Sequence, residues 1–110
     1  MNSEELNAAV YNKMNREQAI YLDWLESLPP HEILQHAYEY TVRQDILFAM
    51  EYMELQPEQC EALLRSKDII GDVLSDFNKI ETGYMDIIRD CIEGRADKMI
   101  RLEAQREEAR

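Results

Sequence analysis

One group of residues has the side-chain types needed to bind a metal ion: His31, Glu32 and His36. In a zinc-binding helix the two histidines stand four residues apart and share one face. His31 and His36 stand five apart, about 140° around a helix, so they cannot chelate one ion together. A di-iron carboxylate site needs a Glu-x-x-His pair, three residues apart, from each of two helices, and only one histidine is near the right place. The sequence therefore predicts no metal site, and a surface pair of Glu32 and His36 near a helix start.

A second cluster combines aromatic, acidic and basic side chains within eight residues: Tyr38, Glu39, Arg43 and Asp45. Glu39 and Arg43 are four residues apart and should form an ion pair on one helix face. Asp45 lies within an otherwise apolar stretch, where unpaired burial would cost several kcal/mol. It either caps a break in the helix or is hydrogen-bonded to a tyrosine or to Trp24. We expect these four residues to form a buried structural network and not a catalytic site.

The sequence contains no other residue pattern with known chemistry. No Ser/His/Asp or Cys/His set is suggested, and three scattered glycines cannot form a phosphate-binding loop. Cys60 and Cys91 belong to no paired cysteine motif. The first residues are acidic and are not followed by an apolar signal segment, so we expect a protein of the reducing cytoplasm. No stretch approaches the roughly 18 apolar residues that span a bilayer. We expect a protein that is not an enzyme, has no cofactor and is not in a membrane.

Acidic residues outnumber basic ones by 23 to 12, a net charge of −11. Direct binding of nucleic acid or of an anionic membrane is disfavoured, because both depend on basic side chains. Two groups of acids stand at helical spacing and are candidates for binding a basic partner protein. These candidate partner-binding residues are Asp68, Asp72 and Asp76, together with Glu51, Glu54, Glu58 and Glu61. Like charges four residues apart, such as those of Asp68, Asp72 and Asp76, destabilise a helix slightly. These acids therefore either serve solubility alone or face a basic partner.

The residues that position these side chains are typical of an all-α protein. Helix-forming residues dominate, and the chain has only three glycines and three prolines. We predict two long helices over residues 3–28 and 30–55, a short third over 57–65 and a long fourth over 68–108. Pro29 ends the first helix, while Pro30 and Pro57 suit the first turns of the next two.

The second predicted helix is apolar around most of its circumference, so we expect the other helices to cover it. The fourth carries a heptad seam from Ile70 to Cys91 that keeps its phase across Gly83, which favours a continuous or slightly kinked helix. We expect the following residues to be largely buried: Trp24, Leu34, Tyr38, Ile46, Ala49, Met53, Phe77, Ile80, Tyr84 and Ile87.

A helix over 68–108 would be about 60 Å long, too long for a compact domain of this size. Its far end must project, fold back or pair with another chain. Because residues 93–110 balance five acids with five bases, we divide the chain into a bundle over 1–92 and a charged helical extension over 93–110. We predict a homodimer with the fourth helix at its interface.

Four segments carry a resemblance to a known family: Trp24-Leu25, Pro30–Leu34, His36–Tyr40 and Arg43–Leu47. Over nearly its whole length the chain resembles an uncharacterised family of short helical domains from gut clostridia and related Firmicutes, often near mobile elements. Gln44 departs from the acidic residue expected before Asp45. The resemblance implies a small accessory protein of a mobile element and suggests an inhibitor of host defence. With the acidic charge, it suggests an anti-CRISPR-like inhibitor on a nucleic-acid-binding surface of a host protein; the alternative is a structural or regulatory dimerisation module.

Overall fold

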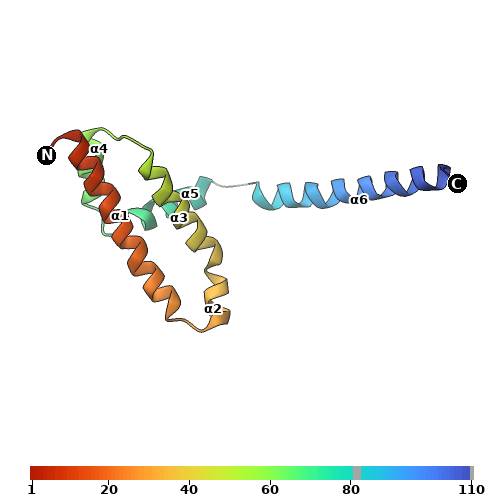
Figure 1. The fold of residues 1–110 in the computed structure, drawn as a ribbon, viewed down its shortest axis with the longest axis horizontal. Helices are drawn as coiled ribbons and strands as arrows, with labels where there is room; N and C mark the ends of the chain where they lie inside the picture. The colour runs from red at the N-terminus through yellow and green to blue at the C-terminus, as the bar shows by residue number, and fades with distance from the viewer. Residues whose placement is uncertain (81–82, 110) are drawn as a thin grey trace. The chain divides into compact units, whose positions relative to one another are not determined.

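The computed structural model describes residues 1–80 and 83–109, and within them it contains six α-helices and no strand (Figure 1). The helices are α1 (Ser3–Glu26), α2 (Pro30–Gln35), α3 (Ala37–Glu51), α4 (Pro57–Leu64), α5 (Ile69–Ile80) and α6 (Tyr84–Glu108). They form two units, Met1–Asn78 and Lys79–Arg110. The predicted all-α class is confirmed, and none of the described helices is long and apolar enough to cross a membrane.

The predicted helix over 30–55 is wrong, because the chain leaves helical geometry at His36 and again after Glu51. His36 has φ −104° and ψ 7°, and its N–H donates to the carbonyl of Ile33, three residues back, where an α-helix would use the fourth residue back. Its ring packs edge-on against Trp24, with 5.0 Å between ring centroids. No proline or glycine marks this break, so periodicity alone runs straight through it.

The predicted continuous fourth helix is also wrong at Gly83, where φ −163° and ψ −2° are not helical. One helix ends at Ile80 and the next begins at Tyr84, and Thr82 lies outside the described residues. A heptad pattern reports which residues share a face, and it can keep its phase across a short interruption. The expected boundary after residue 92 falls within α6.

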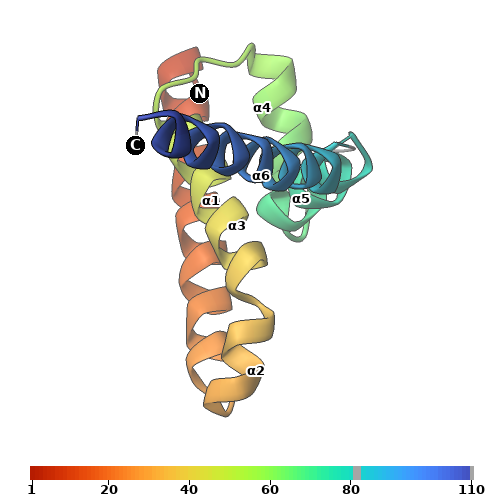
Figure 2. The same ribbon diagram turned by 90° about the vertical axis from the view of Figure 1, so that its right-hand side faces the viewer.

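The unit Met1–Asn78 is built on a helical hairpin (Figures 1 and 2). Two prolines turn the chain after α1, and α2 and α3 return alongside it. Helix α4 then packs against α1, beginning in a capping box formed by Gln56 and Gln59. The side-chain amide of Asn7 fixes this turn, because it donates to the carbonyl of Leu55 at 3.0 Å and accepts from its N–H at 2.8 Å.

The core lies where α1, α3, α4 and the start of α5 meet. It consists of Leu6, Val10, Met14, Leu47, Met50, Cys60, Ile69 and Ile70. The prediction of buried residues is wrong, because none of the ten is a buried core residue. Ile46 is partly buried against the core, and the other nine are exposed. In α5 the buried residues are Ile69, Ile70 and Leu74, so the helix packs through a face rotated away from the predicted seam through Phe77.

Candidate functional site

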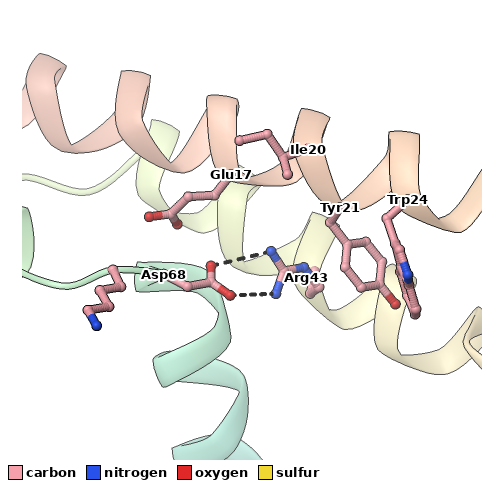
Figure 3. A pocket seen from close by; sticks show the side chains of 7 residues that line it. Glu17, Ile20, Tyr21, Trp24, Arg43 and Asp68 are labelled. Carbon is pink, nitrogen blue, oxygen red and sulfur yellow. Dashed lines mark hydrogen bonds and ion pairs between the residues drawn. The ribbon is translucent and has the colours of Figure 1, made fainter.

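Arg43 is the centre of a group of interacting side chains in the unit Met1–Asn78 (Figure 3). Only 4% of its surface is exposed. Its Nε donates to Oε1 of Gln18 at 3.1 Å, and its two Nη atoms donate to the carboxylate of Asp68 at 3.3 and 3.4 Å. The guanidinium carbon lies 4.4 Å from the ring centroid of Tyr21. Arg43 therefore ties α3 to α1 and to the residue that precedes α5.

The first turn of α5 is satisfied by side chains and is closed to an anion. The carboxylate of Glu17, on α1, accepts the N–H groups of Ile69 at 2.9 Å and Ile70 at 3.1 Å. Asp68 accepts the N–H of Gly71. A Cβ atom at Gly71 would meet the Asp68 carboxylate, so a larger residue here would displace that carboxylate from its present position. Together these contacts cap α5 from two directions.

Beside Arg43 lies an open recess of about 340 Å³. Its lining residues are Glu17, Ile20, Tyr21, Trp24, Arg43, Lys67 and Asp68. Ile20 is 70% exposed and Trp24 is 45% exposed, so the accessible wall is mainly apolar. Two of the charged pairs at this recess are formed within the fold, Glu17 with Lys13 at 2.7 Å and Arg43 with Asp68, while Lys67 is an exposed cation at its edge. Such a recess can accept an apolar side chain, but it presents no activated nucleophile.

Two groups at this site have shifted acidities. Burial raises the pKa of Asp68, but hydrogen bonds from Arg43 and from the Gly71 N–H, with the charge of Arg43, outweigh it and lower the pKa below its usual value. Burial, and then the nearby Glu39 carboxylate, raise the pKa of Tyr21 to about 12. At neutral pH the site therefore holds an ionised Asp68 and a neutral Tyr21.

The lowered pKa of Asp68 predicts a loss of stability in acid. A carboxylate whose pKa is lower in the folded than in the unfolded state stabilises the fold above its unfolded pKa of about 3.9. That contribution disappears as the pH falls through the folded value. In thermal melts at neutral pH, wild type should have a higher melting temperature than Asp68→Asn. This difference in melting temperature should disappear below about pH 4. A difference that stays constant down to pH 2 would contradict the ion pair.

The structure places the predicted acidic residues in two situations. Asp68 is engaged with Arg43, and Asp72 accepts the hydroxyl of Ser66 at 2.6 Å. Asp72 also lies in the first turn of α5, where the helix dipole favours a negative charge, so its position needs no partner to explain it. The remaining predicted residues are exposed: Asp76 on α5, Glu51 at the end of α3, Glu54 in the following turn, and Glu58 and Glu61 on α4.

The predicted buried network forms only around Arg43. Asp45 is exposed, and Tyr38 is 49% exposed. Glu39 pairs with His36 at 3.1 Å, whereas Arg43 pairs with Asp68. The four predicted residues therefore do not form one network. Arg43 instead contacts residues that are far away in the sequence.

Three residues that organise the site were not predicted: Glu17, Gln18 and Tyr21. Each lies on α1 and contacts residues far along the chain. Glu17 bonds to Ile69 and Ile70, 52 and 53 residues later, while Gln18 and Tyr21 contact Arg43, 25 and 22 residues later. The only local signal is the pair of Lys13 and Glu17, four residues apart. Among residues 1–80 and 83–109, no three His, Cys, Asp or Glu side chains are grouped to hold a metal ion.

A family model described as "Protein of unknown function (DUF3848)" matches residues 6–100, so the chain belongs to this family. The match covers all of the site and most of α6. No curated protein and no solved structure matches the chain.

Proposed function

We propose that this family member is a non-catalytic protein-binding module that presents an acidic surface to a basic partner. The charge distribution carries the proposal. Residues 1–78 contain fifteen acidic and five basic side chains, a net charge of −10, while residues 79–110 contain eight and seven, a net charge of −1. Two of the five bases, Lys13 and Arg43, are paired within the fold. The field around this unit is therefore strongly negative and attracts basic surfaces.

The exposed acids around α4 form the most suitable docking surface, which we call the acidic elbow. It comprises Glu51, Glu54, Glu58 and Glu61. These residues follow the chain from the end of α3, through the turn, onto α4. Asp76 adds a further exposed carboxylate on α5. Exposed charges of this kind speed association and set its salt dependence more than they add affinity.

The finer form of the proposal is an inhibitor. A surface that binds nucleic acid is rich in lysine and arginine, because neutralising phosphates supplies much of the affinity. An acidic protein can occupy such a surface in place of the nucleic acid, in the manner of anti-CRISPR proteins. The partner would then be a nucleic-acid-handling protein of the same cell, and nucleic acid would compete for its surface.

The test compares two double variants with the same change of charge. Glu58→Gln with Glu61→Gln removes two acids from the acidic elbow, while Asp23→Asn with Glu26→Gln removes two exposed acids near the end of α1. A protein captured with wild type from lysate of the source cell is purified, and its binding to all three forms is measured against salt. We expect the first variant to bind about tenfold more weakly at low ionic strength, and the control to bind like wild type.

Nucleic acid added to the same measurement tests the inhibitor form. Wild type should be displaced, because both ligands need the same basic surface. Equal binding of the two double variants at low salt would show that the acids serve only solubility. Binding that nucleic acid leaves unchanged would contradict the inhibitor form and leave a module that docks elsewhere on its partner.

A further inference from the structure

Helix α6 has an apolar stripe but no buried residue among its 25 residues. Met85, Met99 and Leu102 are 55%, 47% and 45% exposed, and Ile92 is 64% exposed. Isolated helices are marginally stable in water, and most helices in proteins depend on burying an apolar face. The stripe therefore needs a cover. Its spacing follows two heptad positions, with Met85, Ile92 and Met99 at one and Ile88, Arg95 and Leu102 at the other.

The charges of α6 indicate what covers this stripe, because they alternate in blocks. Residues 86–93 contain three acids and one base, a net charge of −2, and residues 94–101 contain three bases and one acid, a net charge of +2. Each block is thus complementary to the other. The unit Met1–Asn78, by contrast, is acidic and attracts basic partners. A helix with two complementary blocks is suited to pairing with its own copy in the opposite direction.

We infer that α6 forms an antiparallel coiled coil with α6 of a second copy of this chain. With Ile88 opposite Met99 of the second copy, Met85 lies opposite Leu102 and Ile92 opposite Arg95. The same register sets residues 86–93 against residues 94–101, acidic block to basic block, on both sides of the twofold axis. The long side chain of Arg95 can pass the apolar layer and keep its charge in water.

The parallel arrangement is disfavoured by the same residues. It would place Arg95 against Arg95 within the seam, and each charged block against its own copy. Like charges in such positions select against a pairing. The orientation is therefore a consequence of charge, while the association itself depends on the apolar stripe.

Light scattering and sedimentation equilibrium on the full chain test the association. We expect a concentration-dependent rise from 13.0 kDa to twice that mass. Ile88→Glu with Met99→Glu places two like charges in each of two symmetry-related layers and should weaken dimerisation about 100-fold or abolish it. The matched control is Ile87→Glu with Ile100→Glu, which adds the same charge at two exposed apolar positions outside the seam. This control should dimerise like wild type, and circular dichroism should show that all forms keep the folded unit Met1–Asn78.

Crosslinking tests the orientation. In a Cys91→Ser background, one chain carries Met85→Cys and a second, tagged chain carries Leu102→Cys; Cys60 is buried and stays in place. Oxidation of the mixture should give the tagged–untagged disulfide dimer far in excess of either homodimer. Asp97→Cys, which points away from the seam, should crosslink with neither.

Three results would overturn the inference: a mass of 13.0 kDa up to high micromolar concentration, equal weakening by both glutamate pairs, or a predominance of homodimeric disulfides. None of these variants changes the acidic elbow. Failure here is therefore distinguishable from failure of the proposed function.

Discussion

Ile70→Ala should lower the free energy of unfolding by about 3 to 4 kcal/mol, within the usual range for truncating a fully buried aliphatic side chain. Ile70 is 0% exposed and lies in the core with Val10 and Cys60. Its removal would leave a cavity between α5 and the hairpin. Urea denaturation followed by far-ultraviolet circular dichroism measures the loss.

The matched control for this measurement is Phe77→Ala on the same helix. Phe77 is 43% exposed, so its truncation should cost about 1 kcal/mol or less, although it stands on the predicted seam. The sequence pattern alone would assign Phe77 the larger loss. A larger cost at Phe77 than at Ile70 would mean that α5 packs through Phe77 and that the described core is wrong.

Arg43→Ala should lower the free energy of unfolding by about 3 kcal/mol, which is unusually large for the removal of a charged side chain. The variant loses the hydrogen bond to buried Gln18, the contact with the Tyr21 ring and the ion pair with Asp68. Asp68 remains half-exposed and can recover water, so the cost comes mainly from Gln18 and from the lost packing. The same denaturation experiment measures it.

Two further variants separate these contributions. Arg65→Ala removes an exposed arginine and should change stability by less than about 0.5 kcal/mol. Arg43→Met keeps much of the packing volume and should recover part of the loss. If Arg43→Ala and Arg65→Ala were equally mild, Arg43 would not hold the three segments together.

The local signals in the sequence predicted the helix starts well. Pro30 and Pro57 begin α2 and α4 as expected, and α1 starts at Ser3. These residues act through their own backbone geometry, which needs no knowledge of the fold. The break at His36 has no such signal, since it accompanies the packing of His36 against Trp24.

The candidate site was predicted only in part, because its contacts are long-range. Arg43 belonged to the polar cluster, but helical spacing suggested Glu39 as its partner, and the structure pairs it with Asp68. Burial was misjudged for a related reason. A helix that is apolar all round need not be covered all round, and α3 buries only the face with Arg43, Leu47 and Met50.

The capping of α5 by Glu17 has a consequence for the order in which the chain folds. The acceptor for the Ile69 and Ile70 amides lies 52 and 53 residues earlier, on α1. The first turn of α5 therefore cannot be completed until α1 is in place, whatever the helical propensity of residues 69–80. We expect these two amide protons to exchange slowly with solvent, because each must first lose its hydrogen bond to the Glu17 carboxylate. We therefore expect the first turn of α5 to open together with its contact to α1, more rarely than the uncapped first turn of an isolated helix.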